Sequence, residues 1–187
     1  MLITKMSCVT SHRHWKNPLA TIGNMVRIFI ENSVTISTAE SCTGGYISCC
    51  ITDQNGSSKI FQSSTVVYDP KAKQNELGVD PRLTVDSTIV SEKTAIEMNY
   101  GISRRLKKLG LKPCKVNISI TGWIGSSPVK EENNVFFSLG DGEYVETHNV
   151  YVSKGKNKRE KKELLVKRIF LDVLDYMHIP LAEIPIN

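Results

Sequence analysis

The sequence contains no apolar run long enough to cross a membrane. Its longer apolar stretches hold only a few residues, such as VRIFI at 26–30, whereas a spanning helix needs about 20. Residues 1–16 also lack the continuous apolar segment of a secretory signal. An organellar presequence stays open as an alternative, because no acidic residue precedes Glu31. We expect residues 1–16 to form a flexible tail, and we expect no membrane contact.

The sequence also lacks cysteines at C-x-x-C spacing. The five cysteines form an odd set without C-x-x-C spacing: Cys8, Cys42, Cys49, Cys50 and Cys114. This pattern indicates neither a disulfide framework nor a zinc site. We therefore expect a reducing, cytoplasmic setting. We also expect a protein that needs no cofactor.

Histidine is badly placed for a Ser-His-Asp triad. Of the four histidines, His12 and His14 fall in the tail, His148 lies within an expected strand and His178 follows the last expected helix. A serine nucleophile in this chain would therefore need another base. A lysine whose pKa is lowered by burial can fill that role, and a tyrosine beside it can relay the proton.

Positive charge is concentrated in one stretch of the chain. The net charge is +5, but residues 154–168 hold eight Lys or Arg against two Glu and leave 16 basic and 17 acidic residues elsewhere. We interpret this run either as the solvated face of a helix or as a site for an anion such as a phosphate. No aromatic residue interleaves it, which argues against a nucleic-acid surface.

Helical and extended segments alternate through the first two thirds of the chain. We expect helices over 18–30, 46–52, 70–77, 91–109 and 157–177, and strands over 34–39, 63–68, 115–121, 134–139 and 143–153. The GDG at 140–142 predicts a hairpin turn between the last two strands. This order predicts an α/β protein: a three-layer α/β/α sandwich with a mixed, mostly parallel sheet of about five strands. We expect one domain over 17–179, followed by a tail over 180–187.

Three of the expected loops would meet at one edge of such a sheet. They cover 40–45, 68–73 and 121–125, and ligands of open α/β sheets bind beyond the carboxyl ends of the parallel strands. The first loop carries Ser41, which is either a nucleophile or part of a strand-to-helix connector. Lys73 is a candidate base and Tyr68 a candidate proton relay; the alternatives are a surface lysine and a packed aromatic.

The neighbours of Ser41 leave further alternatives. Main-chain N–H groups over 42–45 could form an oxyanion hole where the chain enters a helix. Cys42 is a second candidate nucleophile, although a residue adjacent to Ser41 would point elsewhere. Glu40 is either a general acid or a structural acceptor for nearby amides.

Five short motifs together resemble one known family. They are TAESCTGG at 38–45, GSSKIF at 56–61, VVYDPKAK at 66–73, LGV at 77–79 and VS at 90–91. Their order and approximate spacing are similar to those of the CinA carboxy-terminal domain family. The resemblance spans roughly residues 18–177 and implies an α/β/α fold, a homo-oligomer and no metal requirement.

The family includes nicotinamide-nucleotide amidohydrolases. The resemblance therefore implies hydrolysis of nicotinamide mononucleotide to nicotinate mononucleotide and ammonia, in the salvage of pyridine nucleotides. Ser41 would attack the carboxamide carbon, and Lys73 and Tyr68 would move protons. The substrate-binding residues that we assign with it are Glu40, Cys42, Thr43, Gly44, Gly45, Ser91, Thr121, Gly122, Gly125 and Arg159.

Two segments depart from the family pattern. Where the family has a T-G-I-A-G-P loop, this chain has TGWIGSSPVKEENNVF at 121–136, with Trp123 in place of a small apolar residue. The family's G-D-R is replaced by GKN at 155–157, so its arginine is missing or displaced to Arg159. Lys156 or Lys158 could contact a phosphate as point charges without a bidentate fork. These departures leave a second hypothesis: a nucleotide-binding or interaction protein that keeps the fold without the activity.

Overall fold

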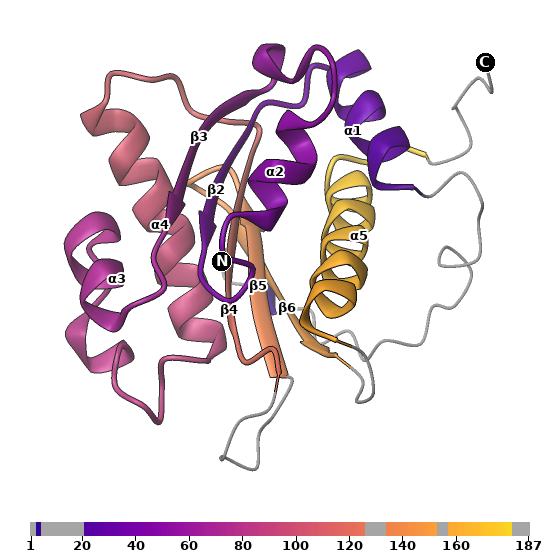
Figure 1. Ribbon diagram of the computed structural model, residues 1–187. Coiled ribbons are helices and arrows are strands. Elements are labelled where there is room, and N and C mark those ends of the chain that lie inside the picture. The colour runs from indigo at the N-terminus through magenta and orange to yellow at the C-terminus, as the bar shows by residue number, and fades with distance from the viewer. Residues whose placement is uncertain (1–2, 5–20, 126–133, 153–156, 181–187) are drawn as a thin grey trace.

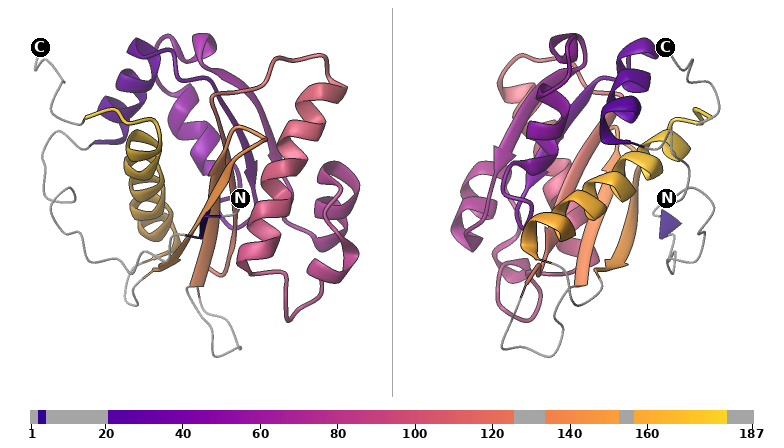
Figure 2. Two further views of the ribbon diagram at one scale, coloured as in Figure 1. Left: turned by 180° about the vertical axis from the view of Figure 1, so that it is seen from behind. Right: turned by 45° about the vertical axis from the view of Figure 1, so that its right-hand side comes forward.

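A six-stranded mixed sheet lies between two layers of helices in the computed structural model of the chain (Figure 1). The structure describes residues 3–4, 21–125, 134–152 and 157–180. Two views from other sides show helices α3 and α4 on one face of the sheet and helices α1, α2 and α5 on the other (Figure 2). The predicted α/β/α sandwich is therefore confirmed.

The elements follow one another in a regular order. The helices are α1 (Ile22–Glu31), α2 (Tyr46–Thr52), α3 (Pro70–Leu77), α4 (Glu92–Lys108) and α5 (Lys158–Tyr176), with short 3₁₀ helices over Ser57–Lys59 and Pro81–Leu83. The strands are β1 (Ile3–Thr4), β2 (Ile36–Glu40), β3 (Phe61–Val66), β4 (Val116–Gly122), β5 (Asn134–Gly140) and β6 (Val145–Tyr151).

The strand order places the ends of three strands at one edge. The sheet runs β1-β6-β5-β4-β2-β3, and β2 pairs in parallel with both β3 and β4. The chain after each of these three strands therefore emerges at the same side of the molecule, as the loop argument predicted. The β4–β5 and β5–β6 pairs are antiparallel, and the predicted hairpin joins the last two strands.

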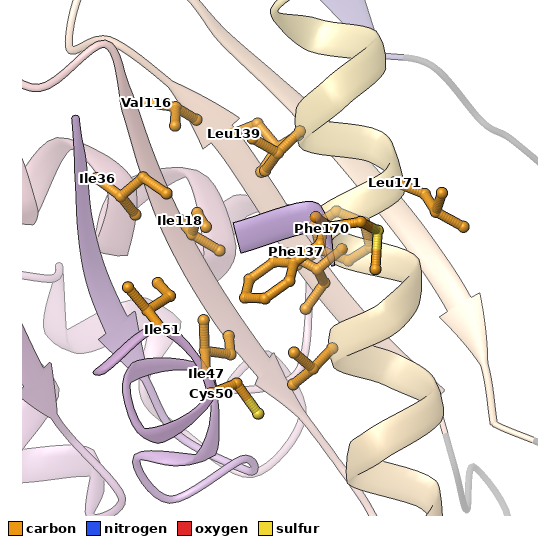
Figure 3. Packing of buried hydrophobic residues seen from close by; sticks show 14 of the residues in the cluster. Ile36, Ile47, Cys50, Ile51, Val116, Ile118, Phe137, Leu139, Phe170 and Leu171 are labelled. Atoms are coloured by element: carbon orange, nitrogen blue, oxygen red, sulfur yellow. The ribbon is translucent and has the colours of Figure 1, made fainter. Parts of the chain in front are cut away.

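Most of the apolar core lies on the face covered by α1, α2 and α5. Ile47, Cys50 and Ile51 of α2 and Phe170 of α5 pack toward Phe137 of the sheet (Figure 3). Phe29 of α1 meets Phe170 edge to face, with ring centroids 5.4 Å apart. A smaller cluster under α3 and α4 covers the other face: Ala39, Val67, Leu77, Val79, Met98, Ile102, Leu106 and Cys114. Strand β2, which directly precedes Ser41, is thus buried on both sides.

Several boundaries differ from those predicted. The sheet has six strands because Ile3–Thr4, within the expected tail, pairs in parallel with β6. The strand expected over 63–68 is Phe61–Val66, so Tyr68 follows the strand instead of ending it. Helix α1 begins at Ile22 after the cap Thr21, and the expected start at Pro18 lies outside the described residues. Within the described part of the chain, no helix has the length and apolar character required to cross a membrane.

Alanine at position 101 should destabilise the protein, although alanine is the better helix former. A Cβ there would lie 2.6 Å from both the Cβ and the carbonyl oxygen of Leu77, so α4 would be forced away from α3. We expect Gly101→Ala to lower the free energy of unfolding by about 1–3 kcal/mol, measured by urea denaturation.

The matched control is Gly23→Ala in α1. Its added methyl would meet only the flexible side chain of Gln54, at 3.3 Å, so this substitution should be neutral or stabilising. Equal losses of stability in the two variants would contradict the packing argument.

Candidate active site

The structure brings Ser41 and Lys73 into direct contact. Ser41 follows the last residue of β2, and Lys73 lies in the first turns of α3. The Lys73 Nζ lies 3.0 Å from the Ser41 Oγ. Ser41 is 6% exposed and Lys73 is 1% exposed, so this pair is shielded from bulk water.

The other neighbours of the Lys73 amine decide what it can do to Ser41. Its Nζ donates to the carbonyl oxygens of Val67, at 2.8 Å, and Tyr68, at 3.3 Å. Carbonyl oxygens only accept hydrogen bonds, so the two N–H groups of a neutral Lys73 amine both donate to them. Its lone pair then remains for the third contact, the Ser41 hydroxyl. The geometry therefore suits a base that removes the proton from Ser41.

Burial makes the neutral form of this amine accessible. It lowers the pKa of Lys73 from 10.5 to about 8, because the charged form loses its hydration, while the negative charge of Asp69 opposes the shift. With that pKa, about one tenth of Lys73 is neutral at pH 7 and about nine tenths at pH 9. An ordinary surface lysine would be almost entirely protonated at both.

The residues that begin and end helix α3 fix the position of Lys73. Asp69 caps α3, since its Oδ1 accepts a hydrogen bond from the N–H of Lys71 at 2.8 Å, and Pro70 occupies the first helical position. Gly78 ends the helix in a left-handed conformation. The direction of helical side chains, back toward the amino end, turns Lys73 toward the strand end that precedes α3.

Tyr68 contacts Lys73 only through its main chain. Its carbonyl contacts the amine, whereas the side chain is 72% exposed. The structure does not bring the Tyr68 hydroxyl to the Ser41–Lys73 pair, and a relay through that hydroxyl stays a prediction from the resemblance.

The loop after Ser41 requires glycine. Gly44 and Gly45 have φ angles of 63° and 90°, the left-handed region that disfavours side chains, and the Gly44 N–H donates to the Ser41 carbonyl at 3.0 Å. Within the described residues, the N–H groups of Thr43 and Gly45 have no acceptor. These two groups are therefore candidates for hydrogen bonds to a negative oxygen next to Ser41.

Cys42 does not suit a nucleophile. Burial raises the pKa of its thiol to about 12, and the positive charges of Lys162 and Lys73 offset only part of this effect. The reactive thiolate is therefore disfavoured at neutral pH. Of the two candidate nucleophiles, the structure favours Ser41.

Four of the predicted substrate-binding residues make contacts that support the fold. Glu40 is fully buried and binds the start of α2. The Ser91 Oγ caps α4 by accepting from the Thr94 N–H at 3.2 Å, and the Thr121 Oγ1 donates to the Ile89 carbonyl at 2.8 Å. A Cβ on Gly122 would lie 2.7 Å from a methyl of Val135, so this glycine permits close strand packing. Direct substrate contact by these four finds no support in the geometry.

One lysine of α5 lies beside the loop after Ser41, and a second lies beside Gly125. The Lys162 Nζ lies 3.4 Å from the position that a Cβ on Gly44 would occupy, and the Lys158 Cε lies 2.5 Å from that of a Cβ on Gly125. The sequence prediction named Lys158 but missed Lys162. The four-residue spacing, which puts both on one helix face, was the available signal.

Arg159 lies near the start of α2. It is exposed, and it acts on α2: burial raises the pKa of Tyr46, and the charge of Arg159 offsets part of that shift. The basic segment is not wholly solvated either, because Lys161 and Arg168 are buried, and the Arg168 Nε donates to Asp172 at 2.7 Å. Lys156, the other predicted phosphate contact, lies outside the described residues.

Comparison with known proteins places the chain in a family. A family model described as CinA C-terminal domain matches residues 20–174. The chain belongs to the CinA C-terminal domain family. A CinA-like protein of Leptospira interrogans serogroup Icterohaemorrhagiae serovar copenhageni is 37% identical over 140 residues, covering 73% of this chain and 32% of the relative. A CinA-like protein of Leptospira borgpetersenii serovar Hardjo-bovis is 38% identical over 129 residues, covering 67% and 29%. The chain thus spans about a third of the length of these relatives.

Solved CinA structures share the fold. A competence-damaged protein (CinA) superfamily protein from Enterobacter cloacae has a TM-score of 0.74 and 24% identity, over 92% of this chain and 99% of that one. The competence/damage inducible protein CihA from Agrobacterium tumefaciens has a TM-score of 0.70 and 25% identity, over 82% and 94%. The CinA C-terminal fold is therefore established for this chain.

The lowered pKa of Lys73 predicts a pH-dependent stability. Between about pH 8 and 10.5, the unfolded chain binds a proton at Lys73 that the folded chain has lost, so the free energy of unfolding should rise with pH, by up to about 3 kcal/mol. Lys73→Met should remove this rise. Urea denaturation at several pH values measures both, and an equal rise in the variant would contradict the assignment.

Proposed function

We propose that this CinA-family chain is an amidohydrolase that cleaves the carboxamide of nicotinamide mononucleotide, giving nicotinate mononucleotide and ammonia. The observation that carries the proposal is the buried Lys73 amine, 3.0 Å from the Ser41 hydroxyl, with both of its neutral-state N–H groups held by carbonyls. A serine with a neutral amine as its base can attack a carbonyl carbon. The family resemblance indicates the substrate, a nicotinamide nucleotide.

The reaction would proceed through an ester of Ser41. The Ser41 Oγ attacks the carboxamide carbon while the Lys73 Nζ takes the proton of the Ser41 hydroxyl. The developing oxyanion accepts hydrogen bonds from N–H groups of the loop that holds Thr43 and Gly45. The Lys73 ammonium then donates that proton to the leaving nitrogen, which departs as ammonia. Water attacks the ester while Lys73 takes one of its protons and returns it to the Ser41 oxygen; the acid leaves and gives up its remaining proton to ammonia, so the final products are the carboxylate and ammonium.

Lys158 and Lys162 would hold the phosphate of the nucleotide. Lys162 lies beside Gly44, so an anion bound to it would lie close to the loop after Ser41, and Lys158 lies beside Gly125. Both are in the first turns of α5, where the helix macrodipole disfavours cations and favours an anion. A bound phosphate would offset that unfavourable arrangement.

Ammonia release from nicotinamide mononucleotide tests the proposal. We expect the purified protein to release ammonia and the nicotinate product in equal amounts, and the rate to increase with pH through about 8 as Lys73 loses its proton. Ser41→Ala and Lys73→Met should each lower kcat by at least about 10³. Turnover no greater than that of Ser41→Ala would refute the amidase assignment.

Nucleotide binding without turnover is the second candidate function. It is favoured by the outward position of the Tyr68 side chain and by Trp123, which is 39% exposed beside the strand end at Gly122. Saturable calorimetric binding of nicotinamide mononucleotide without product would support it. Normal turnover would exclude it.

Removing the α5 lysines should affect binding more than chemistry. Lys162→Met should raise KM for nicotinamide mononucleotide by about 10-fold with little change in kcat, because a phosphate contact stabilises substrate and transition state alike. Nicotinamide riboside, which has no phosphate, should show no such change. Lys107→Met in α4 is the charge-matched control. An equal KM change for both substrates would contradict a phosphate contact.

A further inference from the structure

The residue before Ser41 is a buried carboxylate whose hydrogen bonds all go to polar neutral groups. Glu40 is fully buried. Its Oε2 accepts from the Ile47 N–H at 3.1 Å, and its Oε1 accepts from the Ser48 N–H at 2.9 Å and from the Ser48 hydroxyl. The Thr38 hydroxyl lies 3.5 Å from the same Oε1. Burying a charge is costly unless it is well bonded, so this arrangement calls for a reason.

The carboxylate occupies the positive end of α2. Helix α2 covers Tyr46–Thr52, and its first free N–H groups, those of Ile47 and Ser48, both point to Glu40. They are therefore not available to a substrate oxygen. The groups left to bind an oxyanion are N–H groups of the turn between Ser41 and α2, where Thr43 and Gly45 have no acceptor among the described residues.

We infer that Glu40 is a positioning residue that sets the geometry of this oxyanion turn. Its side chain connects the residue before Ser41 to residues seven and eight positions later, and so closes the segment 41–46 into a ring. Inside the ring, Gly44 and Gly45 adopt left-handed conformations that an unconstrained chain would exchange for others. The inference rests on the proposed acyl-transfer site.

A row of hydroxyl groups supports the carboxylate. Ser48 donates to Glu40, its Oγ lies 2.7 Å from the Ser64 Oγ, and the Ser64 Oγ accepts from Thr38 at 2.8 Å. The Ser48 hydroxyl has one proton, which it can donate either to Glu40 or to the Ser64 Oγ, while the Thr38 hydroxyl donates to Ser64. The network joins β2, β3 and α2, and holds the carboxylate against both strands.

Replacement of Glu40 by glutamine tests the inference without changing the size of the side chain. The amide NH₂ of glutamine would face a main-chain N–H, donor against donor, so the end of α2 should shift. We expect Glu40→Gln to slow covalent labelling of Ser41 by a fluorophosphonate about 100-fold, since small misplacements of catalytic groups have effects of that order. The pH midpoint of labelling, near the Lys73 pKa of about 8, should stay unchanged.

Two further variants make the experiment decisive. Ser48→Ala removes the hydroxyl donor but keeps both main-chain bonds, so it should slow labelling less, by about 5-fold. Ser138→Ala is the matched control: it removes buried hydrogen bonds, including one of 2.9 Å to the Ala95 carbonyl, on the opposite face of the sheet. It should destabilise the fold similarly without slowing the labelling.

The outcomes separate this inference from the proposed function. The phosphonate reports on Ser41 whether or not nicotinamide mononucleotide is the substrate, so a failed ammonia assay with normal labelling leaves the inference standing. Wild-type labelling rates in folded Glu40→Gln, an altered pH midpoint, or equal slowing in Ser138→Ala would each overturn it. If Glu40→Gln does not fold, a wild-type rate in Ser48→Ala overturns it as well. No labelling of the wild-type protein would overturn both proposals.

Discussion

The position of one amine, the Nζ of Lys73, organises the candidate site. It is held between the carbonyls of Val67 and Tyr68 and the hydroxyl of Ser41, and all three come from the ends of neighbouring parallel strands. Because β2 and β3 run in the same direction, the nucleophile and the two carbonyls emerge together at the edge that faces α3. The proposed chemistry depends on this contact, because no histidine of the described residues lies near Ser41, and a serine without a base is a poor nucleophile.

Negative and positive charges are distributed over two helix ends in opposite ways. The start of α2 is neutralised from inside the protein by Glu40, whereas the start of α5 carries Lys162, beside Gly44, and Lys158, beside Gly125. The first arrangement stabilises the protein by itself; at the start of α5, Glu160 offsets part of the unfavourable lysine charge, and a bound anion would offset more. An external phosphate would therefore be directed to α5, while the turn after Ser41 would be left for the oxyanion. The two negative groups of the proposed reaction would thus occupy separate sites.

The sequence predicted the features that depend on local signals. Helix α3 between Pro70 and Gly78 and the cap at Ser91 were correct because proline, glycine and serine act within a few residues of themselves. The contact of Ser41 with Lys73 was anticipated from the meeting of strand ends and from the family resemblance. Bonds from nearby amides to Glu40 were one of two alternatives. The direction of the Tyr68 side chain and the position of Lys162 were not predicted. Each depends on which way a side chain turns in the folded protein, and that direction is set by elements distant in the sequence.

The capping residues around α3 are pronounced because this helix buries a lysine, Lys73. It has eight residues, and isolated helices shorter than about 12 residues are marginal in water. Most helices in proteins are stabilised by burying an apolar face, but the buried residues of α3 are Leu77 and Lys73, and burial of the latter is costly. Caps must therefore supply the stability that packing does not: Asp69 and Pro70 at the start and Gly78 at the end, each contributing on the order of 1 kcal/mol or less. The same buried amine that suits Lys73 to act as a base thus explains why its helix is so clearly marked in the sequence.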